Sequence, residues 1–473
     1  MDFKQKNNQI CIDVKKCAKI CTKNKKICHN LLQMPQIYCI ISLYHLGKVK
    51  ISMKKIYTSI DIGSDSIKIV TAEYYNKKIY VLASHSIKAK GIRKGLVVDS
   101  NLAINAIKDG IKVVSEKLGF NIKKVIVSVP DYNAKFMYVT GTSRVEGAIT
   151  PDNLATAIKA SVYGKLEENY ELVTVEPLEY LIDGEKVEGS IINKTANKLD
   201  VNGIMISVPK KNIYSVIETV ENAGLEVVEI CLSALADYAE VQTDIMDKKV
   251  GAIVNIGHET TNVSVFSKGK LMNTETLQIG GVNVDKDLSY IFGINVFDGR
   301  SIKEKFASAH KRFTGVGDLF PIKNNYGEII RLNQLEVSEV VMSRLNQILD
   351  YAKKQIMILT KHPINYIIIT GGMTEIKSFK NLVYENMGKD VIIYTESTLG
   401  VRDNKYATAL GMIKYYIRKM KSRGKDYSMI TDEDENRLVN PRKNKPKPEE
   451  RSENEVQGIT KLWGNIFKGK EEK

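Results

Sequence analysis

The sequence predicts an α/β fold that is built twice, with a smaller α+β module inserted in its first half. The duplication follows from two glycine-centred turns, at Asp61–Lys68 and, about two hundred residues later, at Asn255–Val263, each after an apolar β-branched run. Short alternating strands between about residues 134 and 215 predict the inserted module. A chain of 473 residues is long enough for two or more domains with sizeable cores.

The first turn follows a predicted strand at Ile56–Ile60. Asp61–Gly63 ends that strand, and Ser64–Ser66 forms a polar tip before Ile67–Val70 returns as a second strand. Glycine lets backbone amides approach a phosphate group closely, and hydroxyl side chains add hydrogen-bond donors. Taken alone, the turn fits an ordinary hairpin about as well as it fits a phosphate-binding site.

The second turn repeats the pattern of the first. A buried-strand run at Val250–Val254 leads into Asn255–Gly257, the tip is His258–Thr261, and Asn262–Phe266 returns as a strand. Two similar half-sites that face each other can hold one nucleotide between them.

A third buried strand, Ile367–Thr370, ends in a double glycine at Gly371 and Gly372. Three strand ends with glycine turns in this order resemble the actin-like ATPase superfamily, whose fold is a duplicated, ribonuclease H-like α/β domain. In that superfamily two turns grip the phosphates of a nucleotide and the third supports the nucleoside. The resemblance therefore implies a nucleotide-binding cleft.

Apolar spacing predicts the remaining elements. Ser100–Leu118 has apolar residues at helical intervals after a Ser-Asn cap, and Val125–Pro130 is a buried-strand run, which gives the strand–helix–strand order of an α/β domain. The other predicted elements are, in order, strands at Lys135–Gly141 and Glu171–Ile182 around a helix near Pro151–Tyr163, a helix at Asn212–Asn222, a strand at Leu225–Ile230, and helices at Leu232–Thr243 and Gln334–Leu359.

The first 52 residues differ from the rest of the chain. They hold five of the six cysteines, and with ten lysines against two acids they carry more than half of the formal net charge of +15. Their cysteines lack paired metal-binding spacing, and the apolar run Ile37–Leu46 is too short to span a bilayer and lacks a clear cleavage site. We expect a natural start at Met53 or, alternatively, a disordered or partner-binding tail.

The remainder of the chain has a single cysteine, Cys231, and is only mildly basic. The scarcity of cysteine favours a reducing compartment over a disulfide framework. No aromatic-interleaved basic stripe accompanies the charge, so we expect no nucleic-acid partner.

Local motifs resemble FtsA, an actin-like cell-division protein, over roughly residues 53–416. They are Gly91–Gly95 with Val98 and Asp99 before the first long helix, Pro177–Tyr180 with Ile182–Gly184 in the insertion, and Leu232–Ala236 before the second turn. FtsA carries its extra subdomain where the insertion lies here, whereas sugar kinases and DnaK-type chaperones lack it there. The resemblance implies a first actin-like domain at 53–133 and 216–249, an inserted subdomain at 134–215, and a second actin-like domain at 250–420.

The C-terminal region changes composition twice. Residues 421–455 are rich in charged residues, Asn and Pro, a composition typical of a flexible linker that cannot form a core. Apolar residues then return on one helical face, and lysines lie beside it: Ile459, Leu462, Trp463, Ile466 and Phe467, with Lys461 and Lys468. We expect residues 456–473 to form an amphipathic membrane-interface helix; a helix docked on a core or a partner is the alternative. FtsA is similar in ending with a short membrane-targeting helix on a flexible linker.

The superfamily resemblance also implies roles for the turn residues. Asp61 is implied to lie near a Mg²⁺ ion bound to the phosphates, reaching it through water, and Glu259 is a candidate for orienting a water, with a solvated loop acid as the simpler interpretation. Asn255 stands where the second turn usually has an aspartate, and an amide cannot carry negative charge toward a metal-bound water. The sequence therefore predicts ATP and Mg²⁺ binding with at most slow ATPase activity. The other residues implied to bind the nucleotide are Gly63, Ser64, Asp65, Ser66, Lys68, Gly257, Thr260, Thr261, Gly280, Gly281, Lys303, Gly371, Gly372 and Met373.

Together these features predict a peripheral membrane protein of bacterial cell division. The FtsA resemblance implies a protein that binds ATP, polymerises with itself and, with other division proteins, tethers FtsZ filaments to membrane lipids on the cytoplasmic face of the septum. A PilM-like pilus-assembly ATPase is an alternative from the same superfamily, although it is not expected to end in a free amphipathic helix. A metabolic kinase is a further alternative, for which the sequence offers no distinctive substrate-pocket motif or catalytic base.

Overall fold

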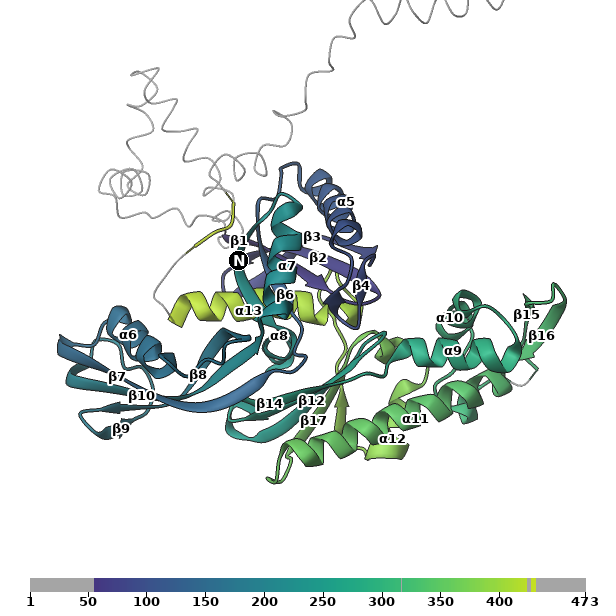
Figure 1. The fold of residues 1–473 in the computed structure, drawn as a ribbon. Helices are drawn as coiled ribbons and strands as arrows, with labels where there is room; N and C mark the ends of the chain where they lie inside the picture. The colour runs from purple at the N-terminus through teal and green to yellow at the C-terminus, as the bar shows by residue number, and fades with distance from the viewer. Residues whose placement is uncertain (1–54, 316, 423–426, 431–473) are drawn as a thin grey trace, which may run out of the picture. The chain divides into compact units, whose positions relative to one another are not determined.

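The structure, a computed structural model, describes residues 55–315, 317–422 and 427–430. In this part of the chain two five-stranded mixed sheets repeat one plan, and a four-stranded antiparallel sheet is inserted in the first half (Figure 1). None of the described helices is long and apolar enough to cross a membrane. The predictions for residues 1–52 and for the helix at 456–473 lie outside the described residues and stay predictions.

The first sheet has the strand order β11-β6-β1-β2-β3. Strand β1 (Lys55–Ile62) runs antiparallel to β2 (Ser66–Tyr75) and parallel to β6 (Lys124–Val129), so the first predicted hairpin lies at the centre of the sheet. Helices α5 and α7 cover one face and share an apolar core with β1, β2 and β6. The bounds of the other elements are β3 Lys78–Lys88, β4 Ile92–Arg93, β5 Leu96–Val97, α5 Ser100–Leu118, α7 Lys210–Asn222 and β11 Glu226–Leu232.

Helix α5 has the predicted bounds but a different cap. The side chain of Asp99 accepts a hydrogen bond from the Leu102 N–H, so Asp99, not the predicted Ser-Asn pair, caps the helix. Gly119 ends the helix with a left-handed φ of 77°, a conformation that glycine adopts without steric cost.

The second sheet has the order β14-β13-β12-β17-β18. Strand β12 (Val250–Ile256) pairs antiparallel with β13 (Thr261–Ser267) and parallel with β17 (Tyr366–Thr370), the same relation that β1 has to β2 and β6. This repeat confirms the predicted duplication. The other elements are β14 Lys270–Leu277, α9 Gly281–Phe292, α10 Val296–Lys305, β15 Leu319–Lys323, β16 Ile329–Asn333, α11 Gln334–Leu359, α12 Phe379–Met387 and β18 Val391–Ile393.

Helices α8 (Ser233–Val241) and α13 (Ala407–Ser422) form a core shared by the two sheets. Buried residues of this core come from both sheets, Val70 from β2 and Phe266 from β13 among them. The two helices pack so closely that a β-carbon added at Gly411 would collide with the carbonyl oxygen of Ala236. A glycine is therefore required at this crossing.

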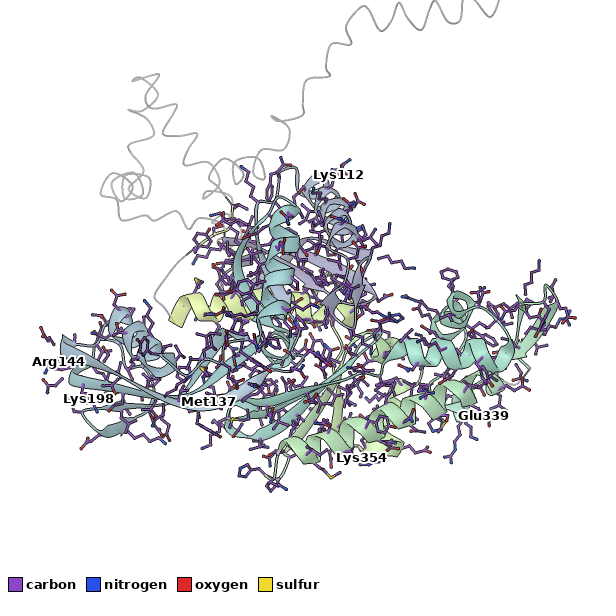
Figure 2. The ribbon with its side chains drawn as sticks, in the orientation of Figure 1. Lys112, Met137, Arg144, Lys198, Glu339 and Lys354 are labelled. Carbon is purple, nitrogen blue, oxygen red and sulfur yellow. The ribbon has the colours of Figure 1, made fainter. Side chains whose placement is uncertain are left out.

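The inserted sheet has the order β7-β10-β8-β9, with helix α6 against one face. Its strand β7 alternates buried and exposed residues over much of its length, so the opposite face carries exposed side chains, and Arg144 lies opposite Lys198 of β10 (Figure 2). The bounds are β7 Lys135–Ala148, α6 Pro151–Val162, β8 Tyr170–Ile182, β9 Glu185–Val187 and β10 Thr195–Pro209.

Three boundaries differ from the predicted ones: the end of the insertion, the end of the second domain and the start of the linker. Tertiary packing, rather than composition, sets them. The insertion ends at Pro209, since α7 starts at Lys210 and packs on β6 and β11 of the first sheet as well as on β8 and β10 of the inserted one. Helix α13, predicted as part of the second domain, packs on β1 and β6 of the first sheet.

The start of the predicted linker also contacts the body. Tyr57 donates a hydrogen bond from its hydroxyl to the carbonyl of Tyr427 over 2.9 Å, and the Met429 N–H donates to the carbonyl of Ile56 over 3.0 Å. The register of β6 on β1 begins only at Ser59, which leaves this stretch of β1 open. Residues 427–430 fill that place, so they belong to the first domain.

Candidate functional site

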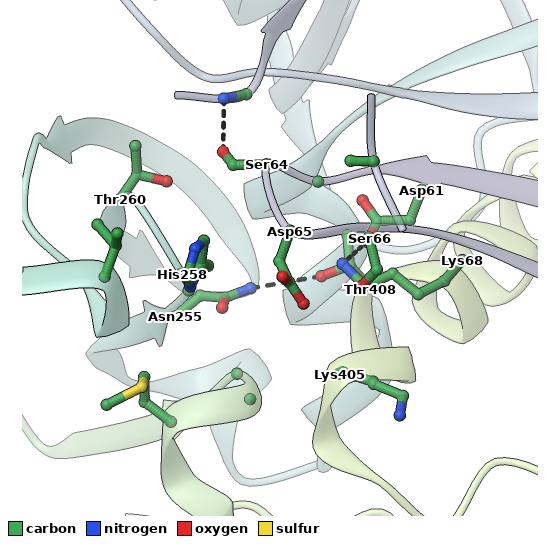
Figure 3. A pocket seen from close by; sticks show the side chains of 18 of the residues that line it. Asp61, Ser64, Asp65, Ser66, Lys68, Asn255, His258, Thr260, Lys405 and Thr408 are labelled. Carbon is green, nitrogen blue, oxygen red and sulfur yellow. Dashed lines mark hydrogen bonds and ion pairs between the residues drawn. The ribbon is translucent and has the colours of Figure 1, made fainter. Parts of the chain in front are cut away.

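The glycine turns of the two halves meet at one cavity of about 870 Å³ (Figure 3). It is lined by both halves of the fold, as the duplicated pattern predicted. The predicted residues that line it are Asp61, Gly63, Ser64, Asp65, Ser66, Lys68, Asn255, Gly257, Thr260, Lys303, Gly371, Gly372 and Met373. Four predicted residues do not line it: Glu259, Thr261, Gly280 and Gly281.

The first turn is built around an ion pair. The Lys68 ammonium lies 3.1 Å from a carboxylate oxygen of Asp61, and both side chains are largely buried. A β-carbon at Gly63 would lie 2.6 Å from the Lys68 Nζ, so glycine leaves room for the ammonium group. The Gly63 N–H donates to the Ser66 carbonyl over 3.2 Å, which closes the turn. A carboxylate and an ammonium thus stand together at the strand end.

The tip of the first turn is fixed to a neighbouring loop. The Ser64 hydroxyl accepts a hydrogen bond of 2.8 Å from the backbone N–H of Gly95, which holds the tip in place (Figure 3).

The second turn is supported from behind by the double glycine at Gly280 and Gly281. The Gly257 N–H donates to the Thr260 carbonyl over 2.9 Å, and the Gly281 N–H donates to the Gly257 carbonyl over 3.0 Å. A β-carbon at Gly280 would lie 2.8 Å from the Gly257 carbonyl oxygen. The double glycine therefore lets α9 begin directly against the turn, and its place is behind the cavity wall rather than in it.

Glu259 and Thr261 point away from the cavity. Thr261 donates its hydroxyl hydrogen bond to the Ile279 carbonyl over 2.8 Å. The Glu259 carboxylate accepts a hydrogen bond from the backbone N–H of Lys94, and the Lys94 ammonium bonds the side chain of Gln278 over 2.5 Å. Glu259 thus joins the second turn to a loop of the first half, which differs from the water-orienting role considered for it.

Asn255 belongs to a buried triad that the sequence did not reveal. Its Nδ2 donates to the Asp237 carboxylate over 2.7 Å, and the Thr408 hydroxyl donates to the other carboxylate oxygen over 2.6 Å. Burial raises the pKa of Asp237 to about 7, although the hydrogen bonds from Thr408 and Asn255 act in the opposite direction. The carboxylate missing from the turn is therefore present one layer deeper, on α8.

The end of the third strand, β17, lies directly beside this triad. Gly371 has a φ of 98°, and a β-carbon there would lie 2.5 Å from both the Asn255 Oδ1 and the Ile256 carbonyl oxygen. Asn255 therefore has its nitrogen toward Asp237 and its oxygen beside Gly371. The side-chain amide at the second turn is held in one orientation by neighbours from two other segments.

Lys303 lies deeper than a solvated lysine would. Its ammonium lies 2.7 Å from the carboxylate of Asp285 and donates to the Gly281 carbonyl over 3.2 Å, and both side chains of the ion pair are less than 5% exposed. Burial raises the pKa of Asp285, against the effect of Lys303. This ion pair anchors α10 to the start of α9, so it fixes the wall of the cavity.

Comparison with known proteins identifies the relatives of this fold. A family model described as cell division protein FtsA matches residues 252–411, and one described as type IV pilus assembly protein PilM matches residues 59–308. The chain is 26% identical to FtsA of Enterococcus hirae, covering 76% of this chain and 82% of that protein, and 23% identical to FtsA of Bacillus subtilis, covering 78% and 86%. By these relatives the chain is an FtsA-like protein, and it belongs to the family that the PilM model describes, because that model matches more than half of the chain.

Solved structures agree with this assignment at the level of the fold. A chain from a structure of a PilM–PilN type IV pilus biogenesis complex superposes with a TM-score of 0.52 at 14% identity, covering 76% of this chain and 98% of that one. The predicted actin-like fold is thereby confirmed. The relatives named FtsA are bacterial cell division proteins, which supports a division role for this chain.

The cleft is also lined by residues that the sequence did not reveal. Asn262 and Thr276 lie opposite each other on β13 and β14, line the cavity, and have side-chain oxygens that are buried without a hydrogen-bond partner in the described part of the chain. Asp131, also in the lining, accepts hydrogen bonds from the N–H of Ala234 at the start of α8. A polar residue directly after a predicted buried strand was the available signal for Asp131, and alternation along β13 was the signal for Asn262.

Proposed function

We propose that the chain binds ATP with Mg²⁺, polymerises, and anchors FtsZ filaments to the cytoplasmic face of the membrane at the division septum. The observation that carries the nucleotide-binding part is that three glycine-ended strands from two similar half-folds converge on one cavity. Similarity to FtsA proteins over 76% of the chain supports the division part. Polymerisation, FtsZ binding and membrane attachment are inferred for this chain from its resemblance to FtsA.

The residues around the cavity fit an anionic nucleotide. The backbone of the first turn and Lys68 would face the phosphate tail, while Gly371 and Met373 would support the nucleoside from the other half. The buried side-chain oxygens of Asn262 and Thr276 have no hydrogen-bond partner among the described residues. They are therefore available to waters or to ligand atoms in the cavity.

A magnesium ion would arrive with the phosphates and neutralise part of their charge. The described residues contain no cluster of three acidic, histidine or cysteine side chains that could hold a metal by itself. Asp61 would reach the ion through water. Asn255 would offer only its Oδ1, because its nitrogen is bound to Asp237. This arrangement favours nucleotide binding over rapid hydrolysis, so the nucleotide would act mainly as a switch.

The proposed membrane anchor is the amphipathic segment at 456–473. Burial of its apolar face can contribute a gross ~1.5–3 kcal/mol for each large side chain, before the cost of ordering the segment. One copy would therefore bind reversibly, and polymerisation would strengthen attachment through multivalency.

The test is flotation of the full chain with anionic liposomes, with and without residues 456–473, ATP and FtsZ. We expect the full chain to float and to carry FtsZ with it, and the truncated chain to stay at the bottom. Trp463→Ala should weaken flotation, whereas Asn465→Ala on the polar side is the matched control and should not. Equal flotation of the truncated chain would show that the anchor lies elsewhere.

Pilus assembly is the second candidate, because the PilM model matches 59–308, more than half of the chain. PilM binds PilN in the solved complex. Co-sedimentation with FtsZ polymers and binding of PilN, measured side by side, separate the two functions. Binding of PilN without FtsZ co-sedimentation would favour pilus assembly.

A further inference from the structure

A charged pair joins the two halves of the fold across the cavity. The Arg300 guanidinium binds both carboxylate oxygens of Asp65; its Nη2 donates to the Oδ2 over 2.9 Å, and its Nη1 contacts the Oδ1. Asp65 lies in the first glycine turn, and Arg300 lies on α10, whose Ile302 is buried in the core of the second sheet. The contact therefore links elements that belong to different cores.

Both partners line the cavity that we propose as the nucleotide site. Their side chains are 26% and 32% exposed, so the pair is partly shielded from solvent while it stays open to an entering ligand. Arg300 also donates from Nε to the Glu304 carboxylate over 2.7 Å. That bond orients the guanidinium and leaves its two terminal nitrogens for Asp65.

Asp65 is an unusual residue for a phosphate-binding turn because it carries negative charge. Burial acts to raise the pKa of Asp65, but the hydrogen bonds and charge of Arg300 outweigh it, and the pKa is lowered. His258 and Lys68 contribute in the same direction. An ionised carboxylate thus faces the place where an anionic phosphate tail would bind, and Arg300 neutralises it.

We infer that Asp65 and Arg300 form a clasp across the cleft, and that the phosphate tail of the bound nucleotide competes with Asp65 for the Arg300 guanidinium. The inference rests on the proposed nucleotide-binding function. A planar guanidinium binds carboxylate and phosphate with the same bidentate geometry, so it can pass from one to the other. The clasp joins the two sides of the cleft, and the phosphate tail would displace the Asp65 carboxylate from Arg300.

Competition predicts opposite effects for the two partners. Asp65→Asn removes the competing carboxylate and its repulsion, so ATP should bind faster and roughly fivefold more tightly, about 1 kcal/mol. Arg300→Gln removes the phosphate partner and leaves Asp65 unneutralised, so ATP should bind roughly tenfold more weakly. In the double variant the affinity should return toward the wild-type value, because the unpaired charge is gone.

The chain provides a matched control in Arg344 and Asp287. This pair is also bidentate, with contacts of 2.5 and 2.8 Å and side chains 27% and 25% exposed, but both partners belong to the second half of the fold, on α11 and α9. Asp287→Asn and Arg344→Gln should leave ATP affinity within about twofold of the wild type.

The measurement is displacement of a fluorescent ATP analogue by ATP in the full chain, with and without Mg²⁺, at low and high salt. Thermal unfolding of each variant shows that it is folded. Tighter binding by Asp65→Asn together with weaker binding by Arg300→Gln supports the clasp. Weaker binding by Asp65→Asn, or unchanged binding by Arg300→Gln, overturns it while leaving the nucleotide site intact. If the wild-type chain binds no ATP, the proposed function fails and the clasp falls with it.

Discussion

Replacing Asn255 with aspartate tests the buried triad beneath the second turn. The change restores the acid that the turn usually has, but it places a second carboxylate next to that of Asp237. In the wild type, Asp237 accepts a 2.7 Å hydrogen bond from the Asn255 Nδ2. The donor is lost and two like charges share one site. Asp237 is only 2% exposed, so water screens the repulsion poorly.

The expected cost follows from these contacts. Losing a hydrogen bond to a charged group costs about 1.5–3 kcal/mol, and leaving a buried charge without its partner costs about 3–5 kcal/mol. Asn255 lines the cavity and is only partly buried, so we expect Asn255→Asp to lower the free energy of unfolding by about 3 kcal/mol near pH 8.

The cost should depend on pH with a defined sign. Two adjacent carboxylates have a raised pKa in the folded state compared with the unfolded chain, so the stability that the protonated pair contributes is present at low pH and lost as pH rises through the raised pKa. The free energy of unfolding of Asn255→Asp should therefore be close to that of the wild type near pH 5 and far lower near pH 8. Exchanging the two residues, Asn255→Asp with Asp237→Asn, restores one charge and one amide and should recover most of the loss.

Urea and thermal unfolding at the two pH values measure these effects. Asn386→Asp is a matched control, since Asn386 also donates to an aspartate, Asp350 over 3.1 Å, at an exposed contact. Its cost should stay below about 1 kcal/mol. Wild-type stability of Asn255→Asp near pH 8, or no recovery in the exchanged variant, would refute the triad as a coupled unit.

Three further predictions follow from single contacts. Gly371→Ala should cost more stability and ATP affinity than Gly388→Ala, because both glycines have a φ near 98–99° but a β-carbon collides with the backbone of Ile256 only at Gly371; thermal unfolding and ATP titration measure the difference. Lys68→Met leaves the Asp61 carboxylate unpaired in the cavity and should weaken ATP binding at least about tenfold in an ATP titration. Lys135→Met, at a surface ion pair, should leave ATP binding unchanged in the same titration. The unfolding temperature of the wild type should fall as pH rises from about 6 to 9. Burial raises the pKa of Asp131 to about 8 and that of Asp237 to about 7 in the folded state, above the values in the unfolded chain. The stability that the protonated forms contribute is therefore lost as pH rises through these values.

The sequence was most informative where local pattern decides structure. Both hairpins lie where alternation and glycine predicted them, and α5 and α11 have the predicted bounds, because a long apolar periodicity is not changed by the neighbours it packs against. The backbone turns around the cavity were therefore predictable as well. Boundaries that depend on which sheet a helix covers, such as that of α13, were not.

Side-chain partners across the cleft could not be read from the sequence. Asp237 and Thr408 lie on helices whose spacing predicts only burial, and their bonds to Asn255 span 18 and 153 residues of chain. Arg300 is one charge among several on a short polar helix. Nothing local distinguishes such a residue from a solvated one, because its role arises only when the two halves close on each other.

Helix α13 contacts the cleft at its first turn and precedes the C-terminal region in the sequence. Its first turn carries Thr408, which is bound to Asp237 beneath the second glycine turn, and the Ser59 hydroxyl donates to the carbonyl of Ala409 over 2.7 Å, which fixes the helix to β1. The far end of the helix leads to residues 427–430, which are bound to the start of β1. Helix α13 packs on β1, β2 and β6 of the first sheet and on α8, which in turn contacts β12 and β14 of the second sheet. A rotation of one sheet against the other would therefore have to shift this helix pair relative to at least one of them.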